Sequence, residues 1–126
     1  MTNGINKKIL IVEDDKDFLW ILKQSFMSAG FFVVTALDAE EGLVVVEKEK
    51  PDLILLDIVL PKMDGIDMAK KLQEAQNAVP IIFLTNMKDE SHISRAMEVV
   101  PRTEYIIKSD LGVNEVVDRV KSKLGV

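Results

Sequence analysis

The sequence of 126 residues contains no cysteine, which excludes disulfide bridges, thiolate metal sites and cysteine nucleophiles. Its 16 basic residues are outnumbered by 21 acidic ones and form no block, so direct binding of nucleic acid is disfavoured. No apolar run approaches the roughly 20 residues of a membrane span. The polar N-terminus does not resemble a signal peptide. We therefore expect a cytoplasmic protein that binds neither nucleic acid nor a membrane.

The length of the chain is normal for one domain and leaves no room for a second. Apolar residues make up 48% of the sequence and charged residues 29%, a composition typical of a folded globular protein. We expect a single domain over residues 1–126, in which residues 1–6 form a flexible N-terminal tail.

Four short apolar runs each stop at polar residues that could take part in chemistry. These polar residues are Glu13 with Asp14, then Asp57, Thr85 and Lys108. The runs are rich in Ile, Leu and Val without alternation, which is typical of strands that are covered on both faces. A short apolar run could also belong to a buried helix. Amphipathic segments of helical length lie between the runs and favour strands.

The chain divides into five strand-helix repeats. Strands are expected at 7–13, 31–35, 52–57, 80–85 and 104–108, and helices at 15–29, 38–50, 67–75 and 113–124, with another that Asp89 or Ser91 caps and that runs through Val99. Right-handed crossovers would make this an α/β protein with a doubly wound parallel sheet and helices on both faces. We choose the strand order 2-1-3-4-5, which places strands one and three side by side.

The carboxyl ends of parallel strands share one edge of the sheet, where ligands bind. Glu13, Asp14 and Asp57 would then face one crevice, together with Thr85 and Lys108. A carboxylate that attacks phosphorus approaches an anion, so positive charge has to offset both groups. Mg²⁺ favours oxygen ligands and keeps several waters, so two carboxylates and a backbone carbonyl suffice to hold it. The sequence predicts a site for a divalent cation and a phosphoryl group.

Motifs along almost the whole chain resemble the receiver domain of two-component response regulators. They are Val12-Glu13-Asp14-Asp15, Leu55 to Pro61 with Met63-Asp64-Gly65, Leu84-Thr85, and Tyr105 to Lys108. The resemblance implies a flavodoxin-like (βα)5 three-layer sandwich and a stand-alone, chemotaxis-type receiver without an output domain. It also implies a signalling switch rather than an enzyme, whose only chemistry is self-catalysed phosphoryl transfer onto one aspartate and its reversal by dephosphorylation.

By this resemblance, Asp57 is the phosphoacceptor for a phosphohistidine on a sensor histidine kinase or a histidine phosphotransfer protein. Glu13 and Asp14 match the acidic pair that positions Mg²⁺, together with Asp57 and the backbone carbonyl of Val59. From the residues alone, Asp15 is interpreted as a helix-capping acid rather than a metal ligand.

The resemblance also assigns the residues that sense the phosphoryl group. Thr85 and Lys108 match the groups that contact its oxygens, and Thr85 with Tyr105 matches the conformational switch. A downstream protein target would bind the face formed by the fourth helix, fifth strand and fifth helix. Ser109 stands where the family usually has proline, so we expect a trans bond and a reshaped loop, which bears on the reach of Lys108. Asn86 replaces a smaller residue and would crowd the site.

Three other functions are alternatives to a phosphorylated receiver. A flavin-binding electron carrier would need a Ser/Thr/Gly-rich phosphate loop where Glu13, Asp14 and Asp15 stand. An aspartate-nucleophile phosphohydrolase would have a second aspartate at the position of Val59. A phosphorylation-independent scaffold stays open, because Ser109 and Asn86 depart from the family pattern.

Overall fold

The computed structural model describes residues 5–86, 90–100, 103–109 and 111–126. The strands are β1 (Lys8–Val12), β2 (Phe32–Ala36), β3 (Leu53–Asp57), β4 (Ile81–Thr85) and β5 (Glu104–Ile107). The helices are α1 (Lys16–Ser28), α2 (Ala39–Glu49), α3 (Gly65–Glu74), α4 (Glu90–Val99) and α5 (Val113–Leu124). Strands and helices alternate along the chain as the sequence predicts.

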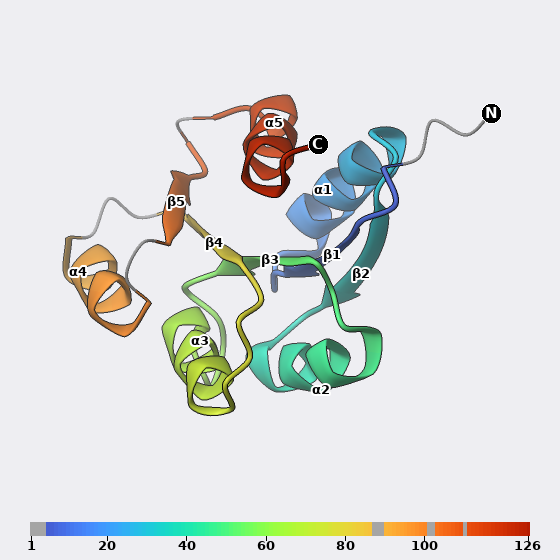
Figure 1. Cartoon of the computed structure of the whole chain (residues 1–126). Helices are drawn as coiled ribbons and strands as arrows, with labels where there is room; N and C mark the ends of the chain where they lie inside the picture. The colour runs from blue at the N-terminus through green and yellow to red at the C-terminus, as the bar shows by residue number, and fades with distance from the viewer. Residues whose placement is uncertain (1–4, 87–89, 101–102, 110) are drawn as a thin grey trace.

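The five strands form one parallel sheet in the order β2-β1-β3-β4-β5, which confirms the predicted strand order. Helices α1 and α5 cover one face, and α2, α3 and α4 cover the other (Figure 1). Because all strands run the same way, their carboxyl ends lie at one edge of the sheet. The fold is therefore the expected doubly wound α/β sandwich.

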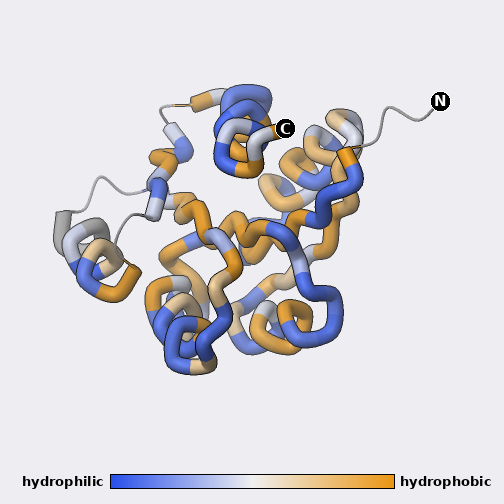
Figure 2. The backbone as a smooth tube through the Cα atoms, viewed as in Figure 1, coloured by the Kyte–Doolittle hydropathy of each residue, from blue (hydrophilic) through white to orange (hydrophobic). Residues whose placement is uncertain are grey.

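Two apolar layers hold the helices on the sheet, one layer on each face. Successive residues of a strand point to opposite faces, so Leu10 and Val12 pack toward α2, α3 and α4, whereas Ile9 and Ile11 pack toward α1 and α5. The apolar residues of the chain gather along the strands and the inner sides of the helices (Figure 2). The central strands are consequently covered on both faces, which explains their unbroken apolar runs.

The N-termini of α1 and α2 are fixed by aspartate caps. Asp15 Oδ1 accepts hydrogen bonds from the backbone N–H groups of Asp17 and Phe18, and Asp38 Oδ1 accepts one from Glu41. Both caps satisfy backbone donors that have no partner inside the helix. The capping interpretation of Asp15 is confirmed.

Helix α3 begins at Gly65, two residues earlier than the expected start at Asp67. Asp64 is its N-cap and accepts a hydrogen bond of 2.8 Å from the backbone N–H of Asp67. The Gly65 N–H donates to the carbonyl of Ile58 at 2.8 Å, so the helix starts directly against the end of β3. The glycine serves close packing rather than a turn, which is why the sequence pattern misplaced the boundary.

Ion pairs connect α4 to the first turn of α3. Arg95 contacts Asp64 at 2.8 Å and also pairs with Asp67. The expected cap Asp89 lies outside the described residues. In the part of the chain that the structure describes, no helix combines the length and apolar character that a membrane span needs.

Candidate functional site

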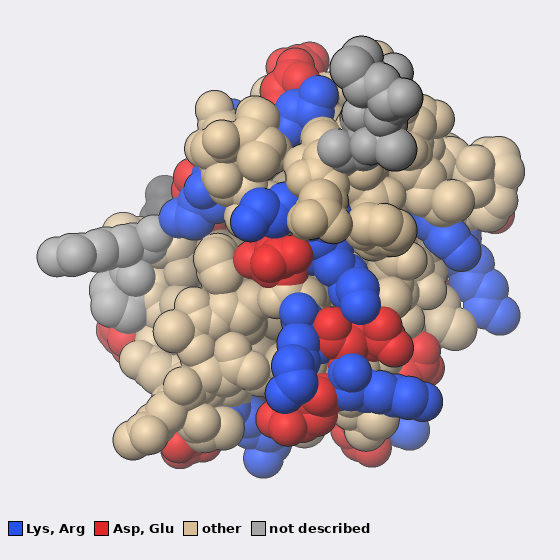
Figure 3. Space-filling model, turned by 45° about the vertical axis from the view of Figure 1, so that its right-hand side comes forward, with Lys and Arg blue, Asp and Glu red and all other residues tan. Residues whose placement is uncertain are grey.

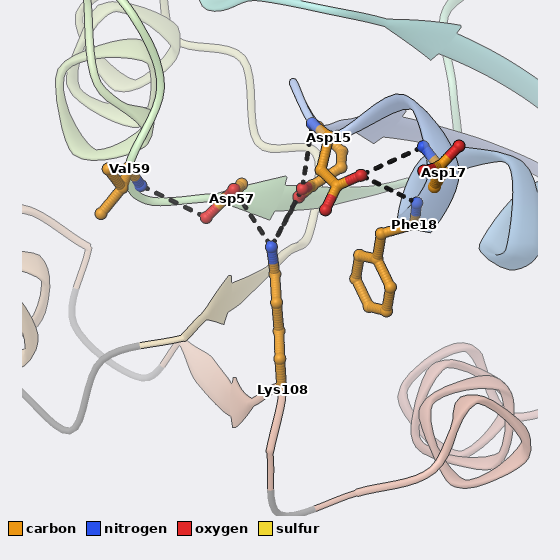
Figure 4. A network of polar contacts seen from close by, with 7 residues as sticks. Asp15, Asp17, Phe18, Asp57, Val59 and Lys108 are labelled. Atoms are coloured by element: carbon orange, nitrogen blue, oxygen red, sulfur yellow. Dashed lines mark hydrogen bonds and ion pairs between the residues drawn. The ribbon is translucent and has the colours of Figure 1, made fainter.

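The ends of β1, β3 and β5 bring together two carboxylates and one ammonium group (Figure 4). Lys108 Nζ lies 2.9 and 3.0 Å from the two oxygens of Glu13 and 3.2 Å from Asp57 Oδ2. The three side chains are between 1% and 9% exposed, so water screens their charges weakly. These groups line a cavity of about 270 Å³.

Asp14 completes a cluster of three acids at this cavity. One carboxylate oxygen each from Glu13, Asp14 and Asp57 lies within 4.8 Å of the others. Glu13 and Asp57 are buried, whereas Asp14 is exposed. Asp15 lines the same cavity, but its carboxylate caps α1. These three carboxylates are therefore close enough to share one small cation.

The backbone that follows β3 fixes Asp57. Its Oδ1 accepts a hydrogen bond of 3.3 Å from the backbone N–H of Val59, while its Oδ2 faces Lys108. Gly65 packs against the Asp57 carbonyl so closely that a Cβ at position 65 would lie 2.1 Å from that oxygen. The orientation of Asp57 thus depends on both the loop and the start of α3.

Lys108 reaches the crevice although Ser109 follows it. The described residues contain no cis peptide bond, as expected for the bond into Ser109. The backbone N–H of Lys108 donates to the carbonyl of Thr85 at 2.8 Å and continues the pairing of β4 with β5. Thr85 is fully buried at the end of β4, and Asn86 lines the cavity beside it.

Tyr105 lies on the opposite face of β5 from the α1 layer, where its ring stacks on Phe83. The centroids are 5.8 Å apart and the rings are 17° from parallel. Its hydroxyl is buried and has no hydrogen-bond partner among the described residues. Burial raises the pKa of the phenol above its ordinary value. A buried hydroxyl without a hydrogen-bond partner is costly to the folded state.

Phe18 contacts the site, although none of the sequence motifs includes it. Lys108 Nζ lies 4.8 Å from the centroid of its ring. The one feature of the sequence that could have indicated this contact is the position of Phe18 in the first helical turn after the acidic pair. That signal is weak, because the contact joins residues at opposite ends of the chain.

Burial and charge shift the proton affinities of the buried pair. Burial raises the pKa of Glu13 from 4.5 to about 7, although the hydrogen bond from Lys108 opposes the shift. The neighbouring Asp57 carboxylate adds to the increase. Burial would lower the pKa of Lys108, but hydrogen bonding to Glu13 and the charge of Asp57 outweigh it and raise that pKa. Glu13 therefore takes up a proton more readily in the metal-free fold than in the unfolded chain.

This difference predicts a pH-dependent stability for the metal-free protein. Between pH 4.5 and about 7, the folded state binds more protons at Glu13 than the unfolded state does. The free energy of unfolding should therefore fall as pH rises through this window. In urea titrations with a chelator present, Glu13→Gln should remove much of this slope. Equal slopes for the variant and the wild type would contradict the assignment.

Comparisons with known proteins agree with this geometry. The sequence profile of the response regulator receiver domain matches residues 9–121. The chain is 46% identical over 86 residues to the alkaline phosphatase synthesis transcriptional regulatory protein PhoP of Bacillus subtilis, covering 68% of this chain and 35% of that protein. It is 32% identical over 120 residues to the sporulation initiation phosphotransferase F of the same bacterium, covering 95% of each.

The fold of this chain also occurs in solved structures. A chain in the CheX-CheY-BeF3-Mg+2 complex from Borrelia burgdorferi superimposes with a TM-score of 0.82 at 30% identity, over 94% of this chain and 89% of that one. The present chain spans between 35% and 53% of the length of the transcriptional regulators PhoP and PrrA that it matches. The profile match, the strand order and the acidic crevice together show that this chain belongs to the response regulator receiver domains of two-component systems.

Proposed function

We propose that this chain is a phosphorylation switch in which Asp57 accepts a phosphoryl group from a phosphohistidine of a sensor kinase or phosphotransfer protein. The observation that supports this most strongly is the position of Lys108, whose largely buried ammonium contacts both Glu13 and Asp57. Such an arrangement offers one acidic nucleophile with a fixed positive charge beside it.

The acid cluster fits Mg²⁺. Glu13, Asp14 and Asp57 would hold the ion together with the backbone carbonyl of Val59, since the carboxylate oxygens lie within 4.8 Å of one another. When bound, Mg²⁺ would offset the negative charge of the carboxylates and of the incoming phosphoryl oxygens. The exposed position of Asp14 leaves room for the waters that this ion retains.

The transfer itself needs little beyond positioning and charge. An oxygen of Asp57 forms a bond to phosphorus while the bond from phosphorus to the donor imidazole nitrogen breaks, and the imidazole keeps that electron pair. Val59 and Lys108 hold the two oxygens of Asp57 before the reaction. Afterwards the Lys108 ammonium pairs with the new phosphoryl oxygens, so the negative charge at the crevice stays compensated.

The test of this chemistry is the intact mass of the protein after incubation with acetyl phosphate. We expect one phosphoryl adduct in the presence of Mg²⁺, little without it, and none in Asp57→Asn. An adduct that persists in Asp57→Asn would refute the assignment. A wild-type protein that gains no phosphoryl group under any of these conditions would favour the phosphorylation-independent scaffold.

The proposed response to phosphorylation passes through Thr85 and Tyr105. The Thr85 hydroxyl would donate to a phosphoryl oxygen, and its inward shift would open space for the Tyr105 ring. The target would then bind the face formed by α4, β5 and α5. Figure 3 shows another part of the surface, where basic and acidic side chains are interspersed, a pattern that does not favour binding of a polyanion there.

Thr85→Ala should separate phosphorylation from this response. We expect the variant to accept a phosphoryl group while the ring resonances of Tyr105 change less than in the wild type. Coupling of roughly 1–3 kcal/mol is typical of such switches, so the wild-type shift should be partial. Tyr105 is the only tyrosine in the chain, which makes its NMR signals unambiguous. Identical tyrosine signals before and after phosphorylation of the wild type would reduce Tyr105 to a packing residue.

A further inference from the structure

We propose that Phe18 is a positioning residue for Lys108, which its ring holds at the crevice by a cation–π contact; the role in phosphoryl transfer rests on the proposed function. Lys108 Nζ lies 4.8 Å from the ring centroid, inside the roughly 6 Å over which a ring face attracts a cation. Figure 4 shows the Phe18 ring beside the lysine stem, on the α1 side of the crevice.

One short segment places both Phe18 and Glu13. The Glu13 carboxylate accepts a hydrogen bond of 3.3 Å from the backbone N–H of Asp15. The Asp15 carboxylate in turn accepts one of 3.2 Å from the backbone N–H of Phe18. These contacts link the end of β1 to the first turn of α1. The carboxylate that pairs with the ammonium and the ring that flanks it are therefore fixed relative to each other.

Lys108 needs support from outside its own strand. It follows the last residue of β5, which is an edge strand, and its four-carbon stem has many rotamers. Its side chain is nevertheless only 9% exposed. A cation–π contact is stronger when water is largely excluded. The ring of Phe18 thus restricts the lysine laterally, while Glu13 and Asp57 attract its charged end.

The uncharged ring has an advantage during phosphoryl transfer. The contacts of Lys108 with the carboxylates have to change when Asp57 carries a phosphoryl group, because new oxygens then compete for the ammonium. The contact with Phe18 does not depend on the charge at Asp57. It can keep the ammonium in the crevice before and after transfer, so an aromatic ring at position 18 should accelerate the reaction.

The test compares three substitutions that retain an apolar or aromatic residue. Phe18→Leu keeps the apolar character but removes the ring face, whereas Phe18→Tyr and Phe18→Trp keep a ring face. With acetyl phosphate and saturating Mg²⁺, we expect Phe18→Leu to slow adduct formation between about 2-fold and about 30-fold. Phe18→Tyr should restore most of the rate. Equal rates for Phe18→Leu and the wild type, or a Phe18→Tyr variant no faster than Phe18→Leu, would overturn the proposal.

A second measurement tests the contact without phosphorylation. A ring face shifts the NMR signals of protons above it, so the Lys108 ε-methylene protons should move toward ordinary lysine positions in Phe18→Leu. Phe31→Leu is the matched control, because Phe31 is a buried ring of the same apolar layer that packs on Phe26. It should lower stability and leave the Lys108 signals in place. If the wild type takes no phosphoryl group, the proposed function fails, while unchanged Lys108 signals in Phe18→Leu would refute the positioning role independently.

Discussion

Replacing Lys108 by methionine should lower the free energy of unfolding of the metal-free protein by about 3 kcal/mol above pH 7. The variant keeps the length of the side chain but leaves Glu13 and Asp57 without the ammonium that contacts both. Removing one partner from a buried ion pair is costly, because the remaining charge stays out of water. Urea denaturation with a chelator present measures this loss.

Two further results should accompany this destabilisation. The loss should shrink below pH 6, because Glu13 with a pKa of about 7 is then mostly protonated. Saturating Mg²⁺ should recover part of the lost free energy of unfolding, because the ion would bind Glu13 and Asp57. Lys123→Met is the matched control, since Lys123 lies 4.0 Å from Glu104 at the surface and such a pair contributes about 1 kcal/mol or less. Equal losses in the two variants would contradict the buried network.

Gly65→Ala should be the most damaging small substitution at the site. The added Cβ would lie 2.1 Å from the carbonyl oxygen of Asp57 and 3.0 Å from the Cα of Ile58. These are backbone atoms, which cannot rotate away, so α3 or the end of β3 has to move. We expect a loss of about 3 kcal/mol in the free energy of unfolding, at the upper end of ordinary overpacking.

Displacement of the Asp57 backbone should also slow phosphorylation in Gly65→Ala. Alanine stabilises a helix by about 1 kcal/mol relative to glycine. Helix propensity alone would therefore predict that Gly65→Ala raises the free energy of unfolding. Gly112→Ala provides the comparison, because its Cβ would meet only Glu115 Oε1 at an ordinary 3.6 Å. It should cost about 1 kcal/mol or less as an N-cap change. If Gly65→Ala were as stable and as reactive as Gly112→Ala, close packing of Gly65 against the Asp57 backbone would not be required for stability or phosphorylation.

The fold could be predicted from the sequence because its strongest signals are local. The apolar runs of β1, β3 and β4 are unbroken since both faces of the sheet are covered. Asp15 and Asp38 mark helix starts by hydrogen bonds that reach only two or three residues along the chain. Parallel pairing then places the polar residue after each strand at one edge, so the crevice follows from topology.

The contacts that the sequence did not reveal depend on side-chain positions in three dimensions. The start of α3 at Gly65 reflects close approach to the Asp57 carbonyl, whereas a glycine after a proline-containing segment is more typical of a turn. The contact of Phe18 with Lys108 joins the first helix to the residue that follows the last strand. A helical pattern cannot distinguish a ring that packs in the core from one that also flanks a cation.

The most direct measurement of the central claim is the position of the phosphoryl group. Borohydride reduces an aspartyl phosphate to homoserine, which peptide mass spectrometry can locate after acetyl phosphate and Mg²⁺ treatment. We predict homoserine at position 57, with Asp14, Asp15 and Asp64 unchanged, because Asp57 alone among these acids is both buried in the crevice and paired with Lys108. Homoserine at another aspartate, with none at position 57, would contradict the account.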